Sequence, residues 1–389
     1  MFALTREFGA LYVATMSMQL GFTLLITYFA LRLEADGVGE VWGGALMAAS
    51  ALGMVAGARV GYWLIDRVTH MPAFVASAGI IVSTVLCLQL SDWLPLWLML
   101  RFVFGLAITC QLMVMESWLN DCAPSGRRGS AMSLYMVAVY GGMIVGQLLL
   151  SIGDGLDARI LTGIAIAYAI GMVPLALHRG VRPRITSQQR VRPSTYLNRL
   201  RQSLGTALVS GILNGSFFSL TPVFIAQLGY APAQVGQLMA LTVAGGLLAQ
   251  FILGRLFDLY SRVALIRLIA TLLALAYAPL AFLDISGYAH LLIAGGVIGF
   301  LQFCFYPLGV AHANENLEQE LRISVAGMLI VMFGIGATIG PLVAGALMDY
   351  VGPQALYQFG IAVTVTLAVL VGITPHAVKT GRRSLECAD

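Results

Sequence analysis

Twelve long apolar runs, separated by short polar connections, constrain this chain more than any other feature of its sequence. Each run reaches the length of about 20 apolar residues that an α-helix needs to cross a bilayer. Because hydrocarbon offers the backbone no hydrogen-bond partners, open sheet edges are not tolerated there, and the runs predict helices. We place these spans near 8–31, 42–63, 72–91, 94–117, 129–152, 158–178, 205–228, 233–254, 263–283, 288–311, 324–347 and 353–374.

The composition agrees with a polytopic membrane protein. Apolar residues make up 59% of the chain and charged residues 10%, whereas a soluble domain usually carries about 25% charged residues. Twelve helices of about 20 residues would use roughly 240 positions, which leaves only short loops in a chain of 389 residues. A sizeable extramembrane enzyme domain is therefore excluded.

A polar, proline-broken stretch divides the runs into two sets of six. It reads R-G-V-R-P-R-I-T-S-Q-Q-R-V-R-P-S-T-Y-L-N-R-L-R and holds seven arginines. We interpret residues 179–204 as a basic linker between an N-terminal bundle, 1–178, and a C-terminal bundle, 205–374, with a tail at 375–389. Contact with anionic membrane lipids is an alternative role for the linker arginines.

The placement of Lys and Arg predicts the orientation. If the N-terminus and the linker share one side, that side holds 18 of the 22 Lys and Arg residues, all but Arg32, Arg59, Arg101 and Arg159. The positive-inside bias then places both termini in the cytoplasm, in a bacterial-type inner membrane. The net charge of +4 thus reflects topology, and no nucleic-acid partner is expected. The loops of the other side carry Glu34, Asp36, Glu40, Asp92, Asp154, Asp157 and Asp284.

A short motif recurs in the two sets. G-A-R-V-G-Y-W-L-I-D-R-V-T-H, at 57–70, ends the second run, and G-R-L-F-D-L-Y-S-R, at 254–262, ends the eighth. Asp66 and Asp258 are 192 residues apart, close to half the chain. The recurrence predicts two structural repeats.

These features resemble the major facilitator superfamily, whose loop signature is Gly-x-Leu-x-Asp-Arg-x-Gly-Arg. The second copy fits better, because Thr69 and His70 replace the usual Gly and Arg in the first. The stretch L-R-F-V-F-G-L, at 100–106, resembles the fourth-span Arg-x-x-x-Gly element of the family. Three further stretches resemble its YcaD-like branch: E-S-W-L-N-D-C-A-P-S-G-R-R-G-S-A-M-S-L-Y at 116–135, S-G-I-L-N-G-S-F-F-S-L-T-P in span seven, and F-Y-P-L-G-V-A-H-A-N-E in span ten.

The resemblance implies twelve transmembrane helices in two pseudo-symmetric six-helix halves that rock around a midplane site. It further implies a secondary transporter driven by a proton gradient. We expect its solute to be a small organic molecule, with an organic anion as one candidate, and we expect the protein to be a monomer. No Gly-x-x-x-x-Gly-Lys-Ser/Thr phosphate loop occurs, so ATP is not the expected fuel. No catalytic or metal-ligand cluster is visible, so we expect no enzyme, cofactor or metal. Alternatives are an exporter of amphipathic drugs or lipids and a non-transporting membrane sensor.

The repeated motif suggests a conformational latch. Asp66 lies at the end of a helix, where its carboxylate can cap the positive N-terminus of a neighbouring helix and pair with Arg67. Such contacts would hold the two halves together on that face. The resemblance implies the same role for Asp258 and Arg262; a purely structural charge at a helix end is the alternative.

Arg101 is the most informative single residue. It lies seven residues into its span, about 10 Å below the outer surface. An arginine at that depth costs at least ~2.5 kcal/mol on insertion scales, so it should face a cavity or a partner. No Asp or Glu occupies the middle of any span. Either carbonyls, water and Tyr135 or Tyr140 satisfy Arg101, or its charge attracts a carboxylate or phosphate of the substrate; the resemblance implies a part in proton coupling.

Other charged residues lie near the cytoplasmic ends of spans. We expect Glu116 to form a structural charge network with Arg59 or Arg67, with a proton-carrier role as the minority view. Glu315 is similarly placed in the second repeat. His312, one turn before it, can titrate near neutral pH and is a candidate coupling residue.

Polar and aromatic residues of the spans are candidates for the substrate site. Polar residues also bind transmembrane helices to one another, so the structural alternative stays open. Pro222 and Pro307 predict bends in spans seven and ten. The candidate substrate-binding residues are Arg101, Gln19, Thr23, Tyr135, Tyr140, Asn214, Phe217, Phe218, Gln302 and Tyr306.

Overall fold

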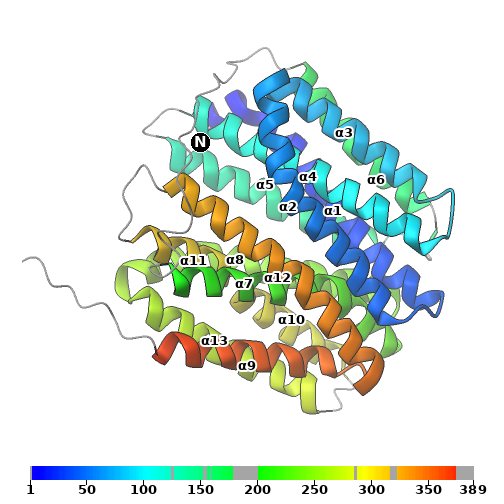
Figure 1. The fold of residues 1–389 in the computed structure, drawn as a ribbon, viewed down its shortest axis with the longest axis vertical. Coiled ribbons are helices and arrows are strands. Elements are labelled where there is room, and N and C mark those ends of the chain that lie inside the picture. Colours follow the sequence, from blue (N-terminus) through cyan, green and yellow to red (C-terminus); the bar gives the residue numbers. More distant parts are fainter. Residues whose placement is uncertain are drawn as a thin grey trace, which may run out of the picture.

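The structure is a computed structural model, which describes residues 2–123, 127–151, 156–157, 159–177, 200–283, 287–315 and 322–373. The predicted linker, up to residue 199, and the predicted tail lie outside the described residues. Within the described part the chain forms thirteen helices (Figure 1): α1 (Phe2–Ala35), α2 (Glu40–Val68), α3 (His70–Cys87), α4 (Leu94–Cys122), α5 (Arg128–Leu149), α6 (Arg159–Ala176), α7 (Arg201–Gln227), α8 (Pro232–Leu259), α9 (Arg262–Phe282), α10 (Tyr288–Gln302), α11 (Phe305–Asn314), α12 (Arg322–Val351) and α13 (Ala355–Ile373).

The prediction of an all-α membrane fold is confirmed. Eleven of the twelve predicted spans fall on one helix each, and span ten falls on two consecutive helices. In the described residues, eleven of the twelve segments are long and apolar enough to cross a membrane. The twelfth, Ala355–Val371, is a shorter apolar helix. The predicted ends differ by up to six residues, and α7 begins at Arg201, inside the segment predicted as linker.

Span ten is broken into α10 and α11 around Phe303 and Cys304. Pro307 explains the position, because a proline lacks the N–H that would bond the carbonyl four residues earlier, which is that of Phe303. The predicted bend in span ten is thus found. Span seven, in contrast, stays a single helix although it contains Pro222.

The helices form two bundles that lie side by side (Figure 1). Helices α1–α6, blue to teal, form the N-terminal half, and α7–α13, green to red, form the C-terminal half. Contacts between the halves come from α1, α2 and α5 against α7, α8 and α12. We call the end of the molecule at which α1 begins the near side, and the end at which it finishes the far side.

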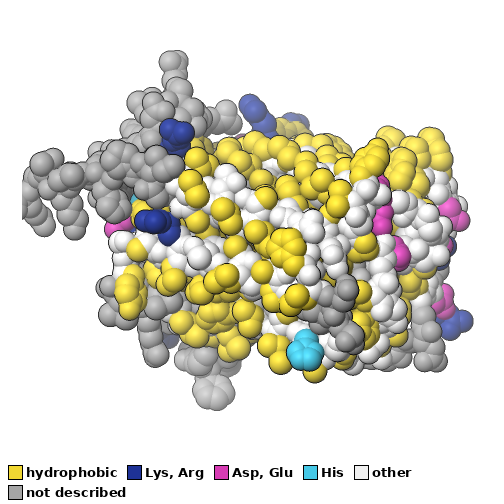
Figure 2. Space-filling model, turned by 90° about the horizontal axis from the view of Figure 1, so that it is seen from below, with side chains coloured by type: hydrophobic (Ala, Val, Ile, Leu, Met, Phe, Trp, Pro, Cys, Tyr) yellow, Lys and Arg dark blue, Asp and Glu magenta, His cyan; other side chains and the backbone are white. Residues whose placement is uncertain are grey.

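The outer surface has the pattern of a membrane protein. Figure 2 shows one face as a broad hydrophobic surface, with most of the visible Lys and Arg at one end and most of the visible Asp and Glu at the other. Large apolar side chains are exposed along the helices, for example Leu248, Phe251, Leu275 and Ile293. Exposed apolar surface of this extent is suited to lipid.

Candidate functional site

An aromatic cluster joins the two halves near the middle of the molecule. The ring of Tyr140, on α5, lies 5.8 Å from that of Phe303, between α10 and α11. Phe303 in turn lies 5.9 Å from Phe218 on α7. Both contacts are close to edge-to-face, the geometry that aromatic quadrupoles favour. Two of the predicted substrate-binding residues, Tyr140 and Phe218, therefore meet across the interface through a third ring, that of Phe303.

The break in span ten positions this third ring. The carbonyl of Phe303, which loses its helical partner to Pro307, accepts a hydrogen bond of 3.3 Å from Gln250 Nε2 on α8. The Gln250 side chain also lies beside Tyr140. One amide from α8 thus satisfies the freed carbonyl and holds the backbone of Phe303 in place.

The polar residues predicted in the C-terminal half form a buried chain of hydrogen bonds. Tyr277 donates to Gln302 Oε1 at 2.5 Å, and Gln302 Nε2 donates to Asn214 Oδ1 at 3.3 Å. Asn214 also donates to the carbonyl of Ser210 at 2.8 Å. Gln302 is fully buried and Asn214 half-buried. Gln302 therefore orients Asn214, the member of the pair that can reach a ligand.

Some predicted substrate-binding residues serve helix packing. Thr23 is fully buried and donates to the carbonyl of Gln19 at 3.0 Å and to that of Met143, on α5, at 3.3 Å. Gln147 bonds back to the Thr23 carbonyl at 3.3 Å. Phe217 packs inside the C-terminal half, 3% exposed, and not between the halves. The sequence could not distinguish these residues from ones that line a cavity.

Arg101 is a buried cation, and most of its guanidinium group has no hydrogen-bond partner. The side chain is 2% exposed, and its Nε and Nη1 atoms have no hydrogen-bond partner. No carboxylate in the described part of the chain pairs with it. The guanidinium carbon lies 5.2 Å from the ring centre of Phe104 and 5.8 Å from that of Phe29, which provides cation–π contacts.

The surroundings of Arg101 differ from the predicted ones. Neither Tyr135 nor Tyr140 hydrogen-bonds it; the tyrosine within electrostatic range is Tyr168 on α6, whose buried hydroxyl also lacks a partner. Arg101 lines a cavity of about 10 Å³, enough for the centre of one water molecule. Ser219 of α7 closes this cavity from the other half. Because Ser219 follows Phe218, the cavity and the aromatic cluster lie at a similar height along α7.

Glu116 faces the space between the halves. Its side chain is exposed, although Met115 and Trp118 beside it are buried. It accepts a hydrogen bond of 3.4 Å from Tyr135 and lies within electrostatic range of Tyr306 on α11 of the other half. The predicted ion pair with Arg59 or Arg67 is not formed among the described residues. A helix can turn its charge either way, and here the carboxylate of Glu116 meets the hydroxyl of Tyr135 instead.

The near-side charges of the C-terminal half form a network within that half. Arg262 Nη1 donates to Glu315 Oε1 at 2.7 Å. His312 lies 3.5 Å from Glu315 through Nδ1 and 3.0 Å from Gln202 through Nε2. Arg262, His312 and Glu315 thus join α9, α11 and α7. The side chain of Asp258 lies outside the described residues, and the predicted latch function of this motif stays a prediction.

In the N-terminal half the motif is open to solvent. Asp66 and Arg67 are exposed, and Arg67 lies over the ring of Trp63 at 5.6 Å without an ion pair to a described residue. The two residues that depart from the family pattern are informative. His70 is buried and lies 2.5 Å from Ser117 through Nε2. Thr69 has φ 71° and ψ 175°, a conformation that is essentially confined to glycine.

Thr69→Gly is therefore expected to stabilise the protein by about 1–2 kcal/mol, since relief of backbone strain exceeds the added entropy of glycine. Thermal unfolding in detergent measures the change. Thr69→Ala is the matched control, because alanine keeps the Cβ that disfavours this conformation, and it should give no such gain. Equal melting temperatures for the glycine and alanine variants would contradict the strain.

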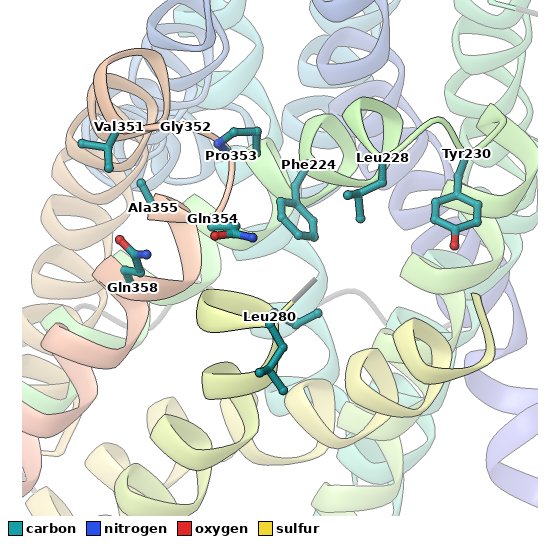
Figure 3. Close-up of a pocket in the computed structure, with 11 residues that line it drawn as sticks. Phe224, Leu228, Tyr230, Leu280, Val351, Gly352, Pro353, Gln354, Ala355 and Gln358 are labelled. Carbon is teal, nitrogen blue, oxygen red and sulfur yellow. The ribbon is translucent and has the colours of Figure 1, made fainter. Parts of the chain in front are cut away.

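A second cavity lies away from these residues. It has about 520 Å³ and opens at the far-side end of the C-terminal half, where Phe224, Leu280, Gln354 and Gln358 face it (Figure 3). The remaining lining residues are Leu228, Tyr230, Leu283, Val351, Gly352, Pro353 and Ala355. All the residues that line this cavity belong to the C-terminal half, and none of them is charged.

The chain matches the family model described as Major Facilitator Superfamily over residues 11–287 and 203–385. A curated relative, the uncharacterized MFS-type transporter YcaD of Salmonella paratyphi A, is 26% identical over 359 residues, which cover 92% of this chain and 93% of the relative. The relative of the same name in Salmonella enteritidis PT4 is 29% identical over 263 residues, 67% of this chain and 68% of the relative.

Two solved structures share the fold. The nucleoside transporter NupG has a TM-score of 0.76 at 15% identity and covers 95% of this chain and 98% of its own. A bacterial homolog of the human lysosomal transporter Spinster, in an inward-facing and occupied conformation, has a TM-score of 0.74 at 14% identity, with 95% of each chain covered. The family model spans nearly the whole chain, and the chain belongs to the major facilitator superfamily.

Proposed function

We propose that the protein is a secondary active transporter that moves a small organic anion across a bacterial-type inner membrane by alternating access, coupled to protons. The observation that carries this proposal is the buried, incompletely paired guanidinium of Arg101 at the junction of the halves. An uncompensated charge inside a membrane protein is expensive, and its retention favours a functional role. A guanidinium presents a planar fork that matches a carboxylate or phosphate.

The neighbours of Arg101 favour an anion with an apolar body. Ser219 lines the arginine cavity, and the preceding residue of α7, Phe218, belongs to the aromatic cluster with Phe303 and Tyr140. An anionic group on Arg101 would place the rest of the solute against these rings, with Asn214 as a polar contact. In the closed arrangement the cavity has no room for such a solute. Solute would therefore reach Arg101 when the halves separate on the far side.

We place the near side in the cytoplasm because of the positive-inside bias. We also propose that the protein is a monomer. The hydrogen bonds between the halves then favour an inward-facing arrangement. Ser151, just after α5, donates to the Ala233 carbonyl at 3.2 Å, and Gln227 Nε2 donates to Glu34 at 3.2 Å, both at the far side. The exposed Glu116 lies towards the near side and is the candidate proton carrier.

A thermal-shift screen of the purified protein tests the proposal. The probes are aliphatic and aromatic organic anions, nucleosides, lipophilic cations and lysolipids. We expect stabilisation by one class of anion, its loss in Arg101→Ala, and a weaker response in Arg101→Lys, which keeps the charge without the fork. Arg59→Ala, which removes an exposed arginine of the same half, should respond like the parent.

Proteoliposomes with an imposed pH gradient then distinguish transport from sensing. Uptake of the stabilising anion that depends on the gradient and on Arg101 would support the proposal. Stabilisation by lipophilic cations or lipids, unchanged in Arg101→Ala, would contradict the anion and favour an exporter of amphipathic compounds. Binding of the anion without net flux would identify a sensor.

A further inference from the structure

The far sides of the two halves are joined by a compact set of hydrogen bonds. The carboxylate of Asp349, near the end of α12, accepts from the backbone N–H of Glu40 at 2.7 Å and from that of Val41 at 3.2 Å. Gln227, the last residue of α7, donates through Nε2 to Glu40 at 2.5 Å and to Glu34 at 3.2 Å. Residues that are about half the chain or more apart in sequence thus meet here.

Asp349 caps a helix of the opposite half. Gly39, which precedes α2, has no side chain to accept the first N–H groups of that helix. A methyl group built on Gly39 would lie 3.4 Å from both Asp349 oxygens, and one on Gly345 would lie 2.7 Å from the Glu40 carbonyl. The halves are therefore in close contact at this point. A carboxylate at a helix N-terminus is stabilised by the helix dipole.

Because Asp349 accepts from the backbone N–H of Glu40 itself, the carboxyl groups of these two residues are close enough to influence each other electrostatically. Two carboxylates cannot make a direct hydrogen bond unless one of them holds a proton, and close pairs of this kind share one. Asp349 already accepts two backbone N–H groups, which favour its charged form, so the proton belongs on Glu40. The contact between the halves therefore includes a pair of carboxyl groups that can hold one proton between them.

The charged groups near this pair offer no compensating cation among the described residues. From α1 it faces the carboxyl group of Glu34, and from α7 the neutral amide of Gln227. The nearest arginine on α1, Arg32, forms an ion pair of 2.7 Å with Asp36 instead. Tyr350, which follows Asp349, is 89% exposed. Loss of the proton would leave two or three negative charges in contact.

We propose that Glu40 and Asp349 form a proton-dependent latch between the halves: closing the far side takes up one proton, and opening it releases that proton. Protonated Glu40 donates its O–H to Asp349, and no other bond is made or broken. When the far side opens, the proton returns to the solvent there, and like-charge repulsion opposes closure. The sign follows: low pH favours the closed far side and high pH the open one. The latch does not depend on the chemical nature of the solute.

Distances between spin labels at Leu90→Cys and Phe282→Cys measure the closure, in a background without the five native cysteines. Both positions are exposed on the far side, one in each half. For one proton, the ratio of closed to open molecules should fall about tenfold per pH unit over the titration range. In Glu40→Gln the side-chain amide can donate to Asp349 at any pH, so this variant should stay closed and lose the pH dependence. Asp349→Asn should also lose it.

Asp36→Asn is the matched control, since it removes a far-side carboxylate whose partner is in the same half. It should keep the slope of the parent. The proposal would be overturned if the closed-to-open ratio of the parent protein did not change from acidic to mildly alkaline pH. So would a Glu40→Gln variant that keeps the slope of the parent, or an Asp36→Asn variant that loses it.

Discussion

Arg101→Met is expected to make the protein more stable and at the same time abolish its response to an anionic solute. The guanidinium is buried with Nε and Nη1 unpaired, so the folded state loses solvation without regaining it in full. Methionine has a similar length, is unbranched and fills irregular space. Replacing buried charged groups by apolar ones of similar volume has stabilised proteins by about 1–4 kcal/mol. Denaturant unfolding in detergent measures the gain.

Two variants test the reason for this gain. Arg59→Met removes an exposed arginine of the same half and should change stability by less than about 0.5 kcal/mol. Arg101→Lys keeps a buried charge and should not stabilise. A destabilised Arg101→Met would mean that the cation–π contacts with Phe104 and Phe29 outweigh the lost solvation. A stable Arg101→Met that still responds to the anion would remove Arg101 from the site.

The arrangement of the spans was predictable because the solvent is uniform. Bilayer thickness sets the length of each helix, so apolar runs alone located all twelve. The break in span ten was also accessible, since Pro307 identifies the carbonyl of Phe303 as the one that loses its bond. What the sequence did not provide was the rescue of that carbonyl by Gln250 on another helix. Tilt and rotation of helices come from packing, which a single sequence does not specify.

The same reason explains the errors at the candidate site. Glu116 was expected beside Arg59 or Arg67 from its depth alone, but its rotation directs it to Tyr135 and the opposite half. The depth of Arg101 in its span correctly identified this residue as exceptional. No pattern in the sequence indicated that Tyr168 lies near it. Thr23 and Phe217 are of residue types that often line binding sites, but the structure places both in contacts between packed helices.

The far-side acidic residues illustrate a second limit. Glu34 and Glu40 indicated membrane orientation, which needs only their side of the bilayer. Their contact with Gln227 and Asp349 joins residues as much as 309 positions apart. No local pattern predicts such a pairing. The family resemblance directed attention to the near-side motif, while the described hydrogen bonds between the halves gather on the opposite side.

Gly44→Ala is expected to open the far side without unfolding the protein. A methyl group on Gly44, in α2, would lie 2.3 Å from the Pro341 carbonyl oxygen of α12, across the interface. Overpacking of this kind costs about 1–3 kcal/mol. Because the halves can separate at this point, the cost falls on the closed arrangement alone, and the closed-to-open ratio should fall about 5- to 150-fold. The spin-label pair at positions 90 and 282 measures the ratio.

Gly53→Ala provides the contrast that makes this result decisive. A methyl group there would lie 2.0 Å from the Phe102 carbonyl oxygen of α4, within one half. These helices cannot separate without loss of the N-terminal core, so the melting temperature should fall while the ratio stays unchanged. A methyl group on Gly79 would have no atom within 4 Å. Gly79→Ala should therefore leave the closed-to-open ratio unchanged and add only a small gain in helix stability of about 0.5–1 kcal/mol. If Gly44→Ala instead melts like Gly53→Ala, the halves do not move as separate bodies, and alternating access around Arg101 is wrong.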